Sequence, residues 1–91
     1  MTVAELKRQM IPGTKLTLTN SLLGPCNKPR TVARVNSVDF MLHQDDKPGA
    51  PVSHCRWPKA SQLVETPKGF RIMEGDEIAV EYELTTAEIV V

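Results

Sequence analysis

The sequence predicts a mainly β fold, a small antiparallel β-barrel of five to seven short strands preceded by a short N-terminal α-helix. Apolar and polar residues alternate along 77–84, which is the period of a strand with one buried face. The 7 proline and 5 glycine residues recur along the chain and divide it into short segments bounded by turns. A helix-capping pattern at the N-terminus predicts the helix.

Size and composition fit one small globular domain spanning residues 1–91. With 91 residues, 41% hydrophobic and 24% charged, the chain is long enough for one domain with a thin core. Its apolar stretches are too short to span a membrane, and the N-terminus lacks a signal-peptide pattern, so we expect a cytoplasmic protein. The 2 cysteines are too few for a disulfide scaffold and are expected to be thiols.

The helix is predicted within residues 1–11. Thr2 and Glu5 have the spacing of a capping box, in which each side chain accepts a hydrogen bond from the other residue's backbone N–H. Leu6 would face the core. The helix must end before Pro12, because the residue before a proline is forced into an extended conformation. We expect this helix to close one end of the barrel.

Period-two patterns and turn residues place the remaining elements. We predict strands at 15–19, 30–37, 38–42, 52–57, 63–65, 70–72 and 77–84, with a last short strand or frayed end at 89–91. We interpret 20–29 as a loop, because it is rich in asparagine, serine, glycine and proline. Residues 59–62 are long enough for a single 3₁₀ turn.

The second strand has two alternative inward faces. One face carries Thr31, Ala33 and Val35, and the other carries Val32 with the two arginines of the strand. We favour the first, because it leaves both arginines in water.

The next two strands have clearer faces. Val38, Phe40 and Leu42 are predicted to point inward from the third strand. Cys55 and Trp57 share one face of the fourth strand, and the two residues that alternate with them lie on the other.

The order of elements is a helix, four strands, a one-turn break, and two or three further strands. This order resembles that of the SH3-like small barrels. The resemblance implies a fold and no particular activity, because many unrelated functions share that fold.

Few residues could carry catalysis or hold a metal. The cysteines and histidines are Cys26, His43, His54 and Cys55. His54 and Cys55 are adjacent on a predicted strand, so their side chains point to opposite faces and cannot cooperate directly. The close-set ligand pairs of structural zinc do not occur in the sequence, nor does a glycine-rich phosphate loop. We therefore expect no enzymatic activity, no metal and no cofactor.

The charges are segregated along the chain. All 11 lysine and arginine residues lie within residues 1–73, and 74–91 holds acidic residues and no basic residue. The acidic segment could present a negative surface to a basic partner. Its candidate protein-binding residues are Glu74, Asp76, Glu77, Glu81 and Glu83. Alternatively, these carboxylates pair with basic residues on neighbouring strands of the same molecule.

A basic patch is the alternative binding surface. Four residues of the predicted strands could bind single-stranded nucleic acid, namely Arg30, Arg34, Arg56 and Lys59. Small barrels that bind single strands also stack bases on exposed aromatic rings. The aromatic residues here fall in phase with the inward apolar set, which places them in the core. The neutral net charge also disfavours strong phosphate binding.

Three blocks of sequence resemble segments of small uncharacterised proteins carried by bacteriophages and prophages. The blocks are Arg30–Val32, Trp57–Ser61 and Gly69–Ile72. The resemblance implies a phage accessory protein, a class that often binds a host factor.

These observations favour a non-enzymatic protein-binding module, such as a phage-encoded modulator or inhibitor of a host defence or nucleic-acid-handling complex. In this reading the acidic C-terminal strand is a recognition edge. The first alternative is a barrel that binds single-stranded nucleic acid. The second is a small homo-oligomeric structural component that assembles through Ile89–Val91.

Overall fold

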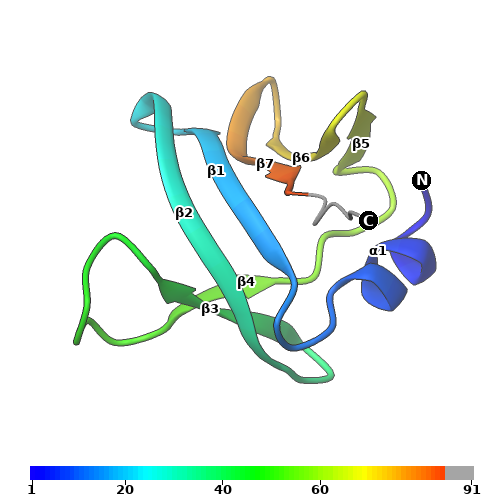
Figure 1. The fold of residues 1–91 in the computed structure, drawn as a ribbon. Helices are drawn as coiled ribbons and strands as arrows, with labels where there is room; N and C mark the ends of the chain where they lie inside the picture. Colours follow the sequence, from blue (N-terminus) through cyan, green and yellow to red (C-terminus); the bar gives the residue numbers. More distant parts are fainter. Residues whose placement is uncertain (86–91) are drawn as a thin grey trace.

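The computed structural model describes residues 1–85 and shows one short helix and seven strands (Figure 1). The elements are α1 (Val3–Gln9), β1 (Lys15–Ser21), β2 (Gly24–Val35), β3 (Asp39–Gln44), β4 (Ser53–Arg56), β5 (Leu63–Thr66), β6 (Gly69–Glu74) and β7 (Glu77–Leu84). The predicted mainly β fold is confirmed. No helix within residues 1–85 has the length and apolar character needed to cross a membrane.

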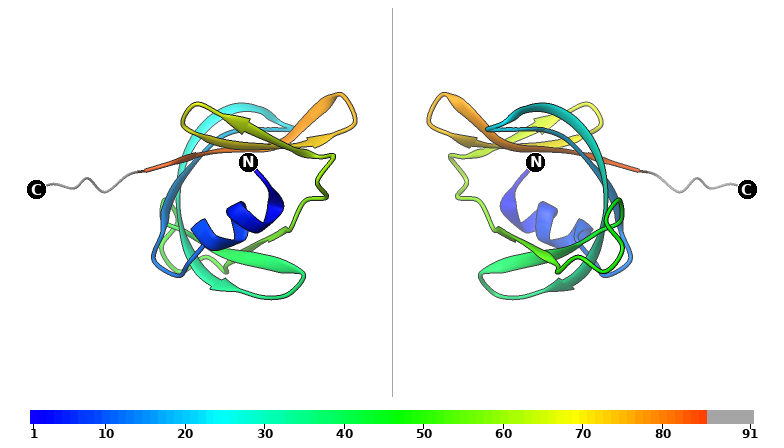
Figure 2. Two further views of the ribbon diagram at one scale, coloured as in Figure 1. Left: turned by 90° about the vertical axis from the view of Figure 1, so that its right-hand side faces the viewer. Right: turned by 90° about the vertical axis from the view of Figure 1, so that its left-hand side faces the viewer.

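All seven strands form a single antiparallel sheet in the order β4-β3-β2-β1-β7-β6-β5. Pairing between β1 and β7 joins a meander of the first four strands to a meander of the last three. The sheet curls into a half-barrel around α1, as the end-on views of Figure 2 show. The edges β4 and β5 are connected by residues 57–62.

The N-terminal helix has the predicted capping box. The Glu5 backbone N–H donates to Thr2 Oγ1 at 3.1 Å, and the Thr2 backbone N–H donates to Glu5 Oε1 at 2.7 Å. Leu6 and Met10, on one face of the helix, are completely buried. Such a short helix is unstable alone, so this buried face is what holds it in place.

The core lies between the inner face of the sheet and α1. Its buried apolar residues are Leu6, Met10, Leu16, Val32, Phe40, Leu42, Phe70, Ile72 and Tyr82. Phe40 packs against Trp57 with ring centroids 4.8 Å apart, and Phe70 packs against Tyr82 at 5.5 Å. Tilted aromatic pairs at these distances are favourable. Phe40 and Leu42 therefore point inward as predicted.

The predicted loop at 20–29 is wrong. β1 continues to Ser21, β2 begins at Gly24, and only two residues form the turn between them. Gly24 has a φ of 107°, which favours glycine at this turn. The prolines in this stretch are tolerated because pairing of β2 with β3 begins only at Arg30. The first half of β2 is therefore an edge, where a missing N–H donor breaks no ladder bond.

The predicted inward face of β2 is also wrong. Val32 is 1% exposed and Arg30 is 7% exposed, whereas Val35 is 39% exposed. The register with β3 shifts between Val32 and Arg34, so this β-bulge breaks the alternation and leaves Arg34 exposed. The rule that keeps arginine in water fails for Arg30, because its charge is met by a carboxylate of the same chain that is itself partly exposed.

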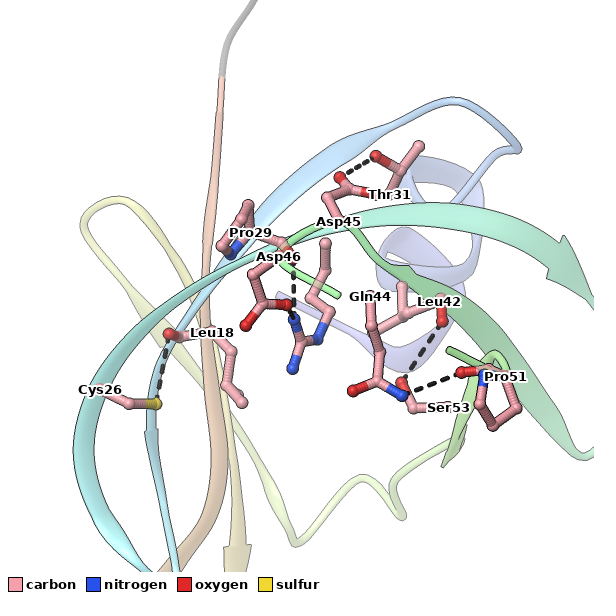
Figure 3. Close-up of polar contacts among 11 residues, drawn as sticks. Leu18, Cys26, Pro29, Thr31, Leu42, Gln44, Asp45, Asp46, Pro51 and Ser53 are labelled. Atoms are coloured by element: carbon pink, nitrogen blue, oxygen red, sulfur yellow. Dashed lines mark hydrogen bonds and ion pairs between the residues drawn. The ribbon is translucent and has the colours of Figure 1, made fainter. Parts of the chain in front are cut away.

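The carboxylate comes from the β3–β4 loop (Figure 3). Arg30 Nη1 lies 2.6 Å from Asp46 Oδ1 and donates to the Pro29 carbonyl at 2.9 Å. Beside it, Thr31 Oγ1 donates to the Asp45 carboxylate. Although burial raises the pKa of Asp46, the hydrogen bond from Arg30 holds that pKa below its ordinary value. The loop that leads into β4 is thus anchored to the centre of the sheet.

One further prediction is wrong, and two others concern the turn at 59–62 and the end of the chain. Val38 was predicted to point inward, but it is 63% exposed and precedes β3. Asn36 and Asp39 form a turn there, in which the Asn36 N–H donates to the Asp39 carbonyl at 2.8 Å. Residues 59–62 form the predicted single turn, closed by the Gln62 N–H and the Lys59 carbonyl at 2.9 Å. The predicted strand or frayed end at 89–91 lies outside the described residues.

Candidate functional site

The acidic strand is not an edge of the sheet. β7 pairs with β1 on one side and with β6 on the other, so its backbone groups are engaged in both ladders. The expectation of a recognition edge at β7 is therefore wrong. Any contact with a partner must use the side chains of this strand or of the turn that precedes it.

In the second half of β7, one of the two glutamates is paired with a basic residue of the same sheet. Glu81 lies opposite Arg71 on β6, with Arg71 Nη2 3.4 Å from Glu81 Oε1. The Glu81 side chain is only 18% exposed. Glu83 stands on the same face, opposite Gly69, and is half-buried. Glu81 therefore follows the alternative interpretation, in which the acidic strand meets a basic residue of the same molecule.

The turn between β6 and β7 differs from the second half of β7, because its carboxylates are exposed. Its three carboxylates belong to Glu74, Asp76 and Glu77, which we call the acidic turn, and all three residues are exposed. Among residues 1–85, no basic group lies within ion-pair distance of any of them. Glu74 and Glu77 are direct partners across the hairpin. Like charges at directly opposite positions destabilise a hairpin, so the pair of Glu74 and Glu77 does not stabilise this turn.

A register shift separates the acidic turn from the rest of β7. Ile72 pairs with Val80, but Met73 pairs with Ile78, so Ala79 is an extra residue on β7. This β-bulge ends the alternation that the sequence shows. Val80 still packs against the core, whereas Ile78 is not among the residues that contact it.

A groove of about 440 Å³ lies where β4 faces the β6–β7 hairpin. We call it the seam groove. Its lining residues are His54, Cys55, Arg56, Trp57, Pro58, Lys59, Gln62, Ile72, Glu74, Ala79 and Val80. The sequence could not reveal this site, because its two walls come from strands that do not pair with each other. A second hollow of about 460 Å³, at the N-terminus and the β5–β6 turn, has mainly polar walls.

The four basic candidates do not form one patch. Arg56 and Lys59 line the seam groove, and both are exposed. Arg34 is exposed on the outer face of β2, opposite Met41. Arg30 is buried and paired with Asp46.

The aromatic residues offer no stacking platform within residues 1–85. Phe40, Phe70 and Tyr82 are buried, as their phase predicts. Trp57 is half-buried, and its Nε1 donates to the Asn36 carbonyl at 2.8 Å. Lys7 Nζ lies 5.5 Å from the centre of the Trp57 ring, which is a cation–π distance. The ring is therefore occupied within the fold.

The thiols and imidazoles are dispersed. Burial raises the pKa of the Cys55 thiol to about 12, so this thiol is protonated near neutral pH and is a poor nucleophile. Cys26 Sγ donates to the Leu18 carbonyl at 3.4 Å (Figure 3). His54 Nδ1 lies 3.0 Å from Asp39 Oδ2. Hydrogen bonds from Asn36 and then from His54 lower the pKa of Asp39. Within residues 1–85, no three His, Cys, Asp or Glu side chains are grouped as metal ligands.

No protein-family model, curated protein or solved structure matches this chain. A function is therefore proposed from the residues and their geometry.

Proposed function

We propose that this protein is a non-enzymatic module that binds another protein, with the acidic turn as part of the contact. The observation that carries this proposal is the direct pairing of Glu74 with Glu77 beside exposed Asp76, with no basic partner among residues 1–85. A basic surface on a partner would relieve the repulsion and would be steered toward the turn by its charge.

The partner best suited to this turn is a protein with a basic surface, such as a groove that otherwise holds nucleic acid. The resemblance of three sequence blocks to small phage and prophage proteins supports a phage-encoded modulator or inhibitor of a host factor. A defence complex or a nucleic-acid-handling complex has the required basic surface.

The alternative of single-stranded nucleic-acid binding has less support. It needs clustered basic residues and exposed aromatic rings, but Arg30 is buried and paired with Asp46, and Trp57 is half-buried with Lys7 near its ring. The alternative of a homo-oligomer through 89–91 concerns residues outside those described, and it stays a prediction.

The test uses the neutral triple variant Glu74→Gln, Asp76→Asn and Glu77→Gln. Tagged protein captures partners from a lysate of the organism in which it acts, and bound proteins are quantified by mass spectrometry. We expect the variant to lose the salt-sensitive partner that the wild type retains, because long-range attraction to exposed charges is screened by salt.

The matched control neutralises three exposed or half-exposed lysines away from the turn, Lys28, Lys47 and Lys68. This control changes the same number of charges and should keep the partner. Equal capture by the wild type and the neutral acidic-turn variant would remove the acidic turn from the binding surface.

A further inference from the structure

The sheet edge at β4 has outward-facing backbone groups. The Trp57 N–H donates to the Val38 carbonyl at 3.1 Å, which fixes this pair as a hydrogen-bonded pair of the β3–β4 ladder. Such pairs alternate with pairs whose N–H and C=O groups point away from the neighbouring strand. Asp39 pairs with Arg56 and Met41 with His54, so the backbone groups of Arg56 and His54 point away from β3.

No strand among residues 1–85 pairs with this side of β4. The Arg56 carbonyl has only a weak contact, from the Cys55 thiol at 3.8 Å. Unpaired main-chain groups along an edge are a template for another extended chain. Pro51 and Pro58 flank β4 and limit such pairing to a short segment.

The seam groove adjoins this edge, so an added strand would lie beside a hollow that can receive its side chains. The opposite wall carries the apolar residues Ile72, Ala79 and Val80. Trp57 and Cys55 line the β4 wall and are half-buried. A volume of about 440 Å³ is ample for one or two aliphatic side chains.

Two basic residues at the β4 side of the seam groove, which we call the rim, favour a ligand of negative charge. Arg56 and Lys59 are exposed at the β4 wall, and Lys59 has no ion-pair partner among residues 1–85. Asp39 lies directly opposite Arg56 in the β3–β4 ladder and offsets part of the charge of Arg56, whereas Lys59 keeps its full charge at this wall. Within residues 1–85, Glu74 is the one carboxylate that lines the groove, and it stands on the far wall. An acidic side chain on the added strand would therefore be favoured next to β4.

We propose that β4 and the seam groove bind an extended segment of another protein as an added strand, with apolar side chains in the groove and acidic side chains beside Arg56 and Lys59. The main-chain groups of His54 and Arg56 supply the affinity, and the groove and rim supply the specificity. This site is separate from the acidic turn in its chemistry, because it uses main-chain pairing and takes an acidic ligand.

The test measures binding of a fluorescently labelled eight-residue peptide in which valine and glutamate alternate. The variant His54→Pro removes one outward N–H without removing a bond to β3, whereas the control His54→Ala keeps that N–H. By fluorescence anisotropy at low salt, we expect His54→Pro to weaken binding about tenfold and His54→Ala to change it less than about threefold.

A second measurement needs no variant that could misfold. The same peptide with alternate backbone amides N-methylated keeps its side chains but cannot pair as a strand, and it should bind about tenfold more weakly. A peptide with lysine in place of glutamate should also bind more weakly, because the rim is basic.

Three outcomes would overturn the proposal. These are no binding of the valine–glutamate peptide at millimolar concentration, equal binding by His54→Pro and His54→Ala, and equal binding of the N-methylated peptide. Self-association seen by light scattering and lost in His54→Pro would assign the edge to a second copy of this chain instead. Glu74 belongs to the acidic turn and also lines the seam groove, but these measurements leave the acidic turn unchanged, so failure of peptide binding and failure of the capture experiment are distinguishable.

Discussion

The two edges of the sheet are alike in length and differ in their surroundings. β4 and β5 each have four residues, and in each strand two residues turn their backbone groups outward. On β5 these residues are Leu63 and Glu65. The Met73 N–H donates to the Gln62 carbonyl at 2.9 Å, so Gln62 and Met73 form a hydrogen-bonded pair, and the next pairs along the β5–β6 ladder alternate between outward-facing and hydrogen-bonded backbone groups. The N-terminal amine of Met1 lies 2.6 Å from Glu65 Oε1.

The chain therefore brings its own N-terminus against β5, whereas β4 faces a groove. Figure 2 shows the N-terminal end beside β5, at the opening that α1 fills. Proteins commonly cover or shorten an edge to prevent unwanted pairing. Here the N-terminal amine pairs with a side chain of β5, whereas β4 is flanked by prolines and adjoins the seam groove. This difference assigns strand addition to β4 and not to β5.

The largest effect expected from a single substitution is at Gly69, where β5 turns into β6. A Cβ added there would lie 2.1 Å from the Tyr82 carbonyl oxygen and 3.0 Å from the Glu83 Cα, so backbone atoms of β7 would have to move. We expect Gly69→Ala to lower the free energy of unfolding by about 3 kcal/mol, at the upper end of overpacking effects. Urea unfolding at pH 7 measures this.

The matched control is Thr66→Ala at the paired position on β5. It should cost less than about 1 kcal/mol, because Thr66 is only half-buried and the new side chain creates no clash. Equal stability of Gly69→Ala and the wild type would show that β6 does not approach β7 at Gly69 as closely as described.

The next largest effect is a difference in stability loss between substitutions of the two arginines of β2. Arg30→Ala removes a buried guanidinium and leaves the Asp46 carboxylate without its partner, so we expect a loss of about 1–3 kcal/mol in the free energy of unfolding. Arg34→Ala, on the exposed face of the same strand, should change it by less than about 0.5 kcal/mol. Equal effects would contradict the burial of Arg30 and with it the anchoring of the loop that leads into β4.

The smallest expected effect is the pH-dependent stabilisation by the ion pair between the N-terminal amine and Glu65 of β5. The hydrogen bond from the N-terminal amine to Glu65 raises the pKa of that amine above its ordinary value of 8.0. A raised pKa means that the pair stabilises the fold below pH 8.0 and that this contribution is lost as the pH rises through the pKa of the folded state. Glu65→Gln should lower the melting temperature slightly at pH 7, and the difference from the wild type should shrink at higher pH. A difference that stays constant across this range would exclude the ion pair as its source.

Local signals in the sequence predicted the elements that depend on near neighbours. The capping box of Thr2 and Glu5 and the alternation of 80–84 involve residues a few positions apart, and both are present in the structure. Likewise, the acidic turn could be located from the sequence, because its residues are consecutive or nearly so.

The faces and edges could not be predicted in the same way. Bulges at Ala33 and Ala79 reverse the alternation, and a bulge is a property of the pairing between strands. The burial of Arg30 depends on Asp46, which approaches it only because β2 pairs with β3. Pairing of β7 with β1 joins opposite ends of the chain and turns the expected edge into an internal strand. The seam groove depends on the same long-range topology.

Amide hydrogen exchange along β4 of the unliganded protein is the most direct test of the open edge. We predict fast exchange at His54 and Arg56, whose N–H groups point away from β3 toward the seam groove. Exchange should be at least about tenfold slower at Cys55 and Trp57, whose N–H groups point toward β3 and the residue before it. Protection of His54 and Arg56 equal to that of Cys55 would mean that this side of β4 is already paired, and the site would not exist.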